Sequence, residues 1–155
     1  MGEIRIASSA DAEQITAVIN AAFRIAEEFF VDGNRITLDE VHRLLAKGAF
    51  FVAQDENGLS GCVYVEPRGE RAYLGLLSVD PSRQQSGLGS RVMTAGEEYC
   101  RARGARFMDI LIVNLRGDLP AFYGRRGYVE NGTTPFPPEI PTKQPCHFIN
   151  MSKSL

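Results

Sequence analysis

The chain has 155 residues, 44% hydrophobic and 23% charged, which suffices for one compact domain and not for two ordinary ones. Its 17 lysines and arginines against 19 acidic residues give a net charge of -2, without the basic excess of a nucleic-acid-binding surface. No apolar run approaches the roughly 20 residues of a membrane span, and no signal-peptide pattern opens the chain. We expect a single domain over 1–155 in the cytoplasm, with no nucleic-acid or membrane partner.

The first segments predict a strand and two helices. Residues 3–7 alternate as a short strand does, and Ser8 with Asp11 forms a capping box. The helix that follows carries an apolar stripe at three-and-four spacing, made of Ile15, Val18, Ile19, Ala22, Phe23 and Ala26. Thr37 begins a second helix, which Gly48 ends.

The middle of the chain predicts three strands and a crossover. Segments 49–54, 59–66 and 71–79 are rich in β-branched and aromatic residues and are joined by short turns, as in an antiparallel meander. A helix with apolar spacing of four and three then runs from Gly87 to Gly104, before a buried-type strand over 107–113. Strand, helix and strand make a right-handed βαβ unit, so two strands of the sheet are parallel.

The last segments predict a short helix over 119–126, a brief strand over 128–130 and a final strand over 146–152. Between the last two strands, residues 132–145 hold five of the chain's eight prolines and are expected to form a long ordered loop. The whole is a mixed α/β (α+β) domain, with a mostly antiparallel sheet of about six to seven strands flanked by about four helices.

The three cysteines indicate neither a disulfide framework nor a metal site. Cys62, Cys100 and Cys146 are odd in number and lack C-x-x-C spacing. His147 adjoins Cys146 on an alternating strand, so their side chains point to opposite faces and cannot share a metal. We expect buried thiols and no metal.

The glycine loop after the third strand of the meander is the strongest chemical signal. Gly87 and Gly89 stand at a predicted helix start, where unpaired amides and the helix dipole favour an anion such as pyrophosphate. Arg83 and Arg91 add positive charge nearby. The loop lacks both the P-loop pattern and the third glycine of a dinucleotide fingerprint.

The loop instead resembles that of the GNAT superfamily of acetyl-CoA-dependent N-acyltransferases. Residues 84–89, QQSGLG, match the family pattern R/Q-x-x-G-x-G/A, and residues 123–128, YGRRGY, match its later Y-x-x-x-G-F/Y element. The order of predicted elements is also that of the family over nearly the whole chain. The resemblance implies an N-acetyltransferase that binds acetyl-CoA in a splay between the strands on either side of the glycine-loop helix.

The resemblance also implies a set of cofactor-binding residues. The pantetheine arm would pair with the backbone of Leu77, Ser78 and Val79 as an added strand, with an amide of Leu77 or Val79 as oxyanion donor. Asn114 would hydrogen-bond a pantetheine amide. The pyrophosphate would lie on the amides of Gln84, Gln85, Ser86, Gly87, Leu88, Gly89 and Ser90.

For catalysis, the resemblance makes Tyr123 the acid that protonates the departing thiolate, since a phenol is protonated at neutral pH; the alternative is a packed aromatic beside Phe122. Some members carry a glutamate base where this chain has Tyr73. We select Glu28 as the base, with a water chain as the alternative. The other candidate carboxylates are Glu27, Glu66 and Glu70.

The acceptor pocket is expected between residues 29–35, Tyr64 and the loop 133–138, where aromatic and acidic side chains mix. That mixture suits a small primary amine with an apolar portion, although Arg24, Arg35 or Arg116 would equally select an acidic end. Two alternatives remain open: an acetyltransferase of protein lysines or N-termini, and a non-catalytic acyl-CoA-binding module. An exposed edge strand would allow a homodimer.

Overall fold

A computed structural model describes residues 3–30, 33–83 and 87–155. Its strands form one seven-stranded sheet in the order β1-β2-β3-β4-β5-β7-β6. The strands are β1 (Glu3–Ile6), β2 (Ala49–Asp55), β3 (Gly58–Arg68), β4 (Arg71–Val79), β5 (Phe107–Val113), β6 (Val129–Pro135) and β7 (His147–Ser154). The helices are α1 (Ala12–Glu27), α2 (Leu38–Lys47), α3 (Leu88–Ala102) and α4 (Leu119–Gly124), with short 3-10 turns at Ser9–Asp11 and Pro81–Arg83.

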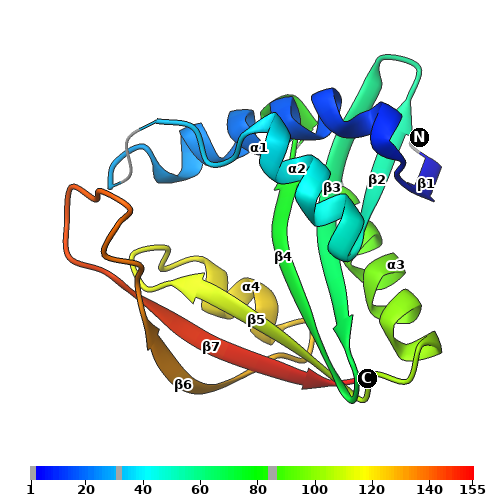
Figure 1. Ribbon diagram of the computed structural model, residues 1–155. Coiled ribbons are helices and arrows are strands. Elements are labelled where there is room, and N and C mark those ends of the chain that lie inside the picture. The colour runs from blue at the N-terminus through cyan, green and yellow to red at the C-terminus, as the bar shows by residue number, and fades with distance from the viewer. Residues whose placement is uncertain (1–2, 31–32, 84–86) are drawn as a thin grey trace.

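The sheet is mixed as predicted, because β4 and β5 are its one parallel pair and every other pairing in the described sheet is antiparallel. That pair is short: its register begins at Arg71 with Phe107 and ends at Tyr73 with Asp109. Beyond this point the two strands diverge into a V, visible between the green and yellow arrows of Figure 1. The predicted splay is therefore present.

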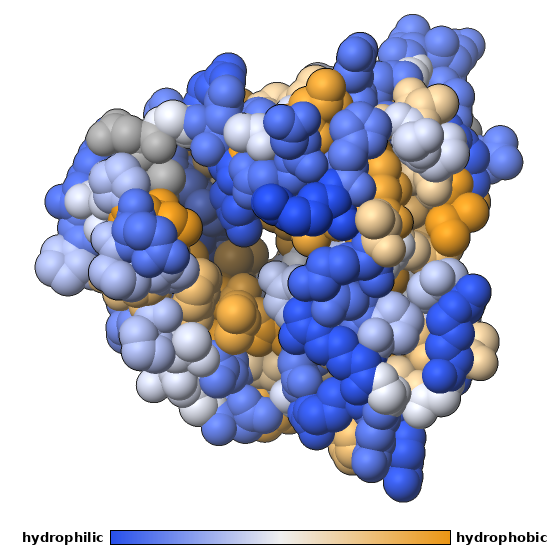
Figure 2. Space-filling view, viewed as in Figure 1, coloured by the Kyte–Doolittle hydropathy of each residue, from blue (hydrophilic) through white to orange (hydrophobic). Residues whose placement is uncertain are grey.

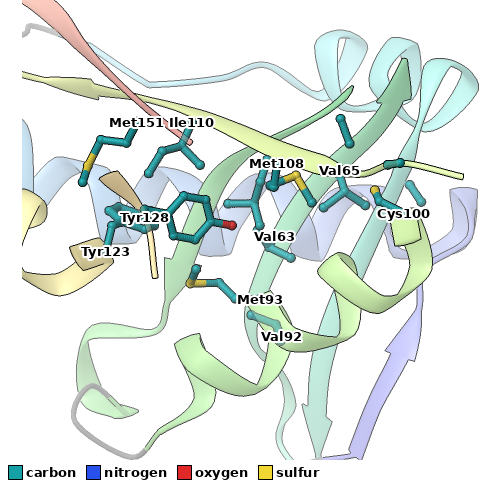
Figure 3. Packing of buried hydrophobic residues seen from close by; sticks show 14 of the residues in the cluster. Val63, Val65, Val92, Met93, Cys100, Met108, Ile110, Tyr123, Tyr128 and Met151 are labelled. Carbon is teal, nitrogen blue, oxygen red and sulfur yellow. The ribbon is translucent and has the colours of Figure 1, made fainter. Parts of the chain in front are cut away.

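Both faces of the sheet are covered (Figure 1). The amphipathic stripes of α1 and α2 meet one face in a core that includes Ile15, Ile19 and Val41. On the other face, α3 packs closely on β3 because Gly96 has no side chain: a Cβ there would lie 2.7 Å from Cγ1 of Val65. Figure 3 shows this second core, where residues of α3 meet those of β3, β5 and β7.

Local signals fix the helix starts. The predicted capping boxes at Ser8 with Asp11 and at Thr37 with Glu40 are both formed. Each leaves fewer unpaired amides at its helix start, which is why short polar motifs were sufficient to locate α1 and α2. None of the described helices is long and apolar enough to cross a membrane.

Two expectations for the C-terminal third need correction. The strand expected over 128–130 is longer, because β6 pairs with β7 as far as Pro135 opposite His147. An edge strand has no partner on one side, so a proline at its end costs no ladder bond. The proline-rich loop shortens accordingly to residues 136–146. Cys146 lies in this loop and is partly exposed rather than buried, unlike Cys62 and Cys100.

Candidate active site

A cavity of about 880 Å³ fills the splay between β4 and β5. The outer halves of both strands line it, and α1, α4, the start of α3 and the loop after β6 complete its walls. In Figure 2 it shows as a hollow near the middle of the molecule, with hydrophobic residues along its wall. The size suits a small substrate together with part of a long cofactor.

One wall of the cavity is the backbone of β4. Leu77, Ser78 and Val79 line it, and β5 offers this stretch no ladder partner. A bulge in the β3–β4 register accompanies Leu76, whose φ of 57° lies in the left-handed region that disfavours side chains. Such strain concentrates at functional sites, and here it accompanies a bulge that lies beside the cavity, after which Ser78 and Val79 pair again with β3.

A second wall is the start of α3. Gly87, Leu88, Gly89 and Ser90 line the cavity, and Gly87 has a φ of 81°, which a side chain would strain. As the N-cap, Gly87 supplies no side-chain acceptor to the first amides of α3. These amides suit an anion. Gln84, Gln85 and Ser86, which were also predicted to bind the pyrophosphate, lie outside the described residues.

One arginine lines the cavity near the start of α3, but it is neither Arg83 nor Arg91, the two that the sequence predicted there. Arg83 forms an ion pair with Asp55 at the end of β2. Arg126, which was not predicted, lines the cavity, donates from Nε to Ser90 Oγ at 2.8 Å and stacks 3.7 Å from the ring centroid of Phe122. The sequence did hold a signal for this contact, because Arg126 follows Phe122 by four residues and residues at that spacing are neighbours on a helix.

Tyr123 of α4 lines the cavity. Its ring is 8% exposed and lies beside Tyr128, with 5.7 Å between the centroids (Figure 3). Among the described residues, the Tyr123 hydroxyl has no hydrogen-bond partner. It is also not among the fully buried polar atoms that lack a partner, since the described residues contain none. The hydroxyl is therefore accessible from the cavity that Tyr123 lines. Burial raises the pKa of this phenol, which keeps it protonated at neutral pH.

The four candidate carboxylates differ in their distance from the cavity: two line a pocket and two do not. Only Glu27 among them lines the main cavity; it is buried and pairs with Arg116 at 3.1 Å. Burial raises the pKa of Glu27, against the opposing effect of Arg116. Glu28 is exposed and lines a smaller neighbouring pocket of about 290 Å³. Glu66 is buried under Tyr64, and Glu70 is exposed outside both pockets.

Asn114 and part of the expected acceptor wall lie elsewhere. The side-chain oxygen of Asn114 accepts the amide of His147 at 2.8 Å, which extends the β5–β7 ladder, and the residue is outside the cavity lining. Tyr64 is buried and Phe29 is exposed, and neither of them lines the cavity. Tyr73, Arg35 and Phe136 do line the cavity.

The family of the chain is shown by its match to the model of the acetyltransferase (GNAT) family over residues 16–128. Since this match covers most of the chain, the protein belongs to the GNAT acetyltransferase family. It is an acyltransferase that uses acetyl-CoA.

Solved structures share the whole fold. Ribosomal-protein-alanine N-acetyltransferase from Brucella melitensis is 20% identical, with a TM-score of 0.78 and coverage of 99% of both chains. The protein yncA from Salmonella typhimurium, solved with its cofactor acetyl-CoA, is 17% identical with a TM-score of 0.78, covering 99% of this chain and 94% of that one. The PaiA N-acetyltransferase from Thermoplasma acidophilum, in complex with coenzyme A, is 15% identical with a TM-score of 0.77, covering 100% and 99%.

The residues present fit acetyl-CoA. The end of β4 presents backbone without a partner on β5 to a ligand with amide groups. The glycine start of α3 and Arg126 offer donors and charge to a pyrophosphate. The cavity joins both features to Tyr123.

Proposed function

We propose that this acetyltransferase acetylates a primary amine of a small molecule. The observation that carries the proposal is the attachment of the loop after β6 across the acceptor end of the cavity. There the loop after β6 is fastened to the end of α1: the amide of Lys143 donates to the carbonyl of Phe30 at 2.7 Å, and its Nζ donates to the carbonyl of Glu28 at 2.8 Å. A polypeptide acceptor would need an open groove at this place.

We assign acetyl-CoA to the two backbone walls. Leu77, Ser78 and Val79 pair with the pantetheine arm, and the loop from Gln84, Gln85 and Ser86 through Gly87, Leu88, Gly89 and Ser90 holds the pyrophosphate, with Arg126 beside it. Bound acetyl-CoA supplies an acetyl thioester. The amide of Leu77 or Val79 stabilises charge on its carbonyl oxygen. Asn114 reaches the pantetheine only through its remaining amide N–H groups, since its oxygen is occupied.

The chain's own groups account for the protons. The neutral amine attacks the thioester carbonyl, an N–C bond forms and the C–S bond breaks. Tyr123 gives its phenolic proton to the departing sulfur. The amine's proton leaves through water to the carboxylates at the end of α1: Glu27 lines the cavity, and Glu28 lies next to it in the smaller pocket.

The test is release of thiol from acetyl-CoA with a panel of small amines, lysine peptides and peptides with free N-termini. Tyr123→Phe should lower kcat about a hundredfold while the Kd for coenzyme A stays within about twofold, because the ring and its packing remain. Tyr99→Phe is the matched control, since Tyr99 of α3 packs against Phe51 of β2, outside the cavity lining. Release with peptides alone would refute a small-molecule acceptor; no release with any amine would refute transferase activity.

A further inference from the structure

An arginine marks the junction of the main cavity with the smaller pocket. Arg35 lines both, and its guanidinium carbon lies 5.5 Å from the ring centroid of Phe23. Burial raises the pKa of Tyr73, and the charge of Arg35 acts in the opposite direction, which places Arg35 near Tyr73 at the acceptor end. The cation therefore faces the space where an acceptor must lie.

The other arginines of the main cavity are already engaged. Arg116 pairs with Glu27 at 3.1 Å and with Asp118 at 3.5 Å, and Arg126 holds Ser90. Arg35 has no ion pair within the described ranges, 3–30, 33–83 and 87–155. Its charge acts to lower the pKa of Glu27, which lines the same two pockets, but Arg116 is the residue that forms the ion pair with that carboxylate.

The backbone beside Arg35 is held in place from α1. The Asn20 side chain donates to the carbonyl of Ile36 at 2.9 Å and accepts its amide at 3.0 Å. Ile36 itself is 3% exposed and packs in the core under α1 and α2. Arg35 therefore extends from a fixed backbone position, which lowers the entropy lost when its side chain binds a ligand.

The preceding residue adds a second donor. Asn34 also lines both pockets. Its side-chain oxygen accepts from Arg24 at 3.3 Å, so its amide N–H groups remain for another acceptor. A guanidinium and a primary amide side by side form a donor set that matches the two oxygens of a carboxylate.

One carboxylate without an ion pair in the described part of the chain also lines the main cavity. Glu139 is exposed on the loop after β6. An acceptor that carried only a positive amine would find this carboxylate but would leave Arg35 facing a like charge. An acceptor with both an amine and an acid would satisfy both groups.

We propose that the acceptor is an amino acid or related amine with an anionic group, and that Arg35, with Asn34, binds that group. This rests on the proposed small-molecule acetyltransferase activity and names its substrate class. The anion at Arg35 fixes the far end of the acceptor and leaves the amine free to reach the thioester between β4 and Tyr123. Specificity would follow from the charge pair, since the amine without the acid loses its partner for Arg35.

The experiment compares acceptors in pairs that differ only in the acid. L-phenylalanine and 2-phenylethylamine, L-methionine and 3-(methylthio)propylamine, and 4-aminobutyrate and propylamine are assayed for thiol release from acetyl-CoA. For at least one pair, the acid-bearing member should have a kcat/KM about tenfold higher or more, because a charge-assisted contact is worth at least this factor. Arg35→Gln should remove the preference through KM, and Arg35→Lys should retain part of it.

Arg43→Gln is the matched control, because Arg43 is an exposed arginine of α2 outside both pockets. It should keep the preference. Binding gives a second readout: with coenzyme A present, calorimetry should show about tenfold weaker binding of the N-acetylated acid product to Arg35→Gln than to wild type. Equal or better turnover of the neutral amines, with no effect of Arg35→Gln, would overturn the inference and leave the transferase intact. Absence of turnover with every amine would instead overturn the proposed function.

Discussion

Replacing Asp11 with Asn tests how the helix that carries the acceptor wall is anchored. Asp11 lies at the start of α1 with its side chain only 10% exposed. Its two oxygens accept from Arg5 Nη1 and Nη2 at 2.9 and 2.8 Å, and the Ser8 amide also donates to it, at 2.9 Å. Asparagine keeps the shape and one acceptor but loses the charge and the paired geometry.

The expected loss of stability follows from the shifted pKa of the Asp11 carboxyl. The hydrogen bond from Arg5 lowers the pKa of Asp11 from 3.8 to about 2, which corresponds to about 2 kcal/mol of stability. Because Arg5 is itself 32% exposed, solvent screening reduces our expectation to about 1–2 kcal/mol. The folded-state pKa is below the unfolded one, so this contribution is present above about pH 4 and is lost as the pH falls toward about 2.

The assay is urea unfolding of wild type and Asp11→Asn at pH 7 and at steps down to pH 3. The variant should be less stable by about 1–2 kcal/mol at pH 7, and the gap should shrink below about pH 4. Asp39→Asn is the control, since Asp39 is an exposed carboxylate in the first turn of α2, where the dipole contributes about 0.5 kcal/mol. A gap that stays constant with pH would refute the assignment of this stability to the ionised Asp11.

Two further predictions concern the cofactor loop. Gly87→Ala and Gly69→Ala each place a side chain at a positive φ with nothing within 4 Å, so each variant should lose about 1 kcal/mol of stability in thermal unfolding. Only Gly87→Ala should also raise the Kd for coenzyme A. Equal Kd values for the two variants would contradict the anion site at α3. Asp55→Asn removes the carboxylate that pairs with Arg83 just before the glycine loop and should raise the Kd for coenzyme A severalfold by calorimetry. Glu56→Gln loses the same negative charge in the adjacent turn, which by itself favours an anion, so it should not raise the Kd; an equal rise there would refute a specific role of the Arg83–Asp55 pair.

Much of the fold was predictable because its signals are local. The capping boxes at Ser8 and Thr37 depend on neighbours three residues away. The parallel pair of β4 and β5 follows from the handedness of a strand, helix and strand sequence. The start of α3 lies where the glycine pattern predicted it, because Gly87 adopts a backbone that other residues avoid.

The carboxylate at the site shows a signal that was present but not used. The stripe of α1 includes Phe23 and Ala26, and one turn beyond Phe23 comes Glu27, which therefore continues the inward face. Glu28 is rotated by about 100° from that face, and its side chain is exposed. Continuing the stripe by one step would have favoured Glu27 over Glu28 as the residue that lines the cavity.

Other features depend on contacts between distant segments. The bulge at Leu76 requires two residues of β4 to oppose one of β3, and the LGLL sequence there carries no mark of it. Asn114 was assigned to the cofactor from its place after β5, and the hydrogen bond that its oxygen accepts from the His147 amide depends on the docking of β7. Strand pairing of this kind is settled by the whole sheet and not by either segment alone.

The cofactor end of the cavity is formed by backbone and the acceptor end by side chains, and this explains why the family resemblance identifies the cofactor but not the acceptor. The cofactor end is built largely from backbone: the end of β4, beyond its short pairing with β5, and the first amides of α3. Many sequences can supply such backbone, which is why chains no more than 20% identical share the fold with TM-scores near 0.78. The acceptor end is built from side chains on the α1–α2 segment and the loop after β6, including Arg35 and Glu139. Since those residues can change without disturbing the sheet, the acceptor has to be inferred from their charge and geometry, and that charge favours an amine that also carries an acid.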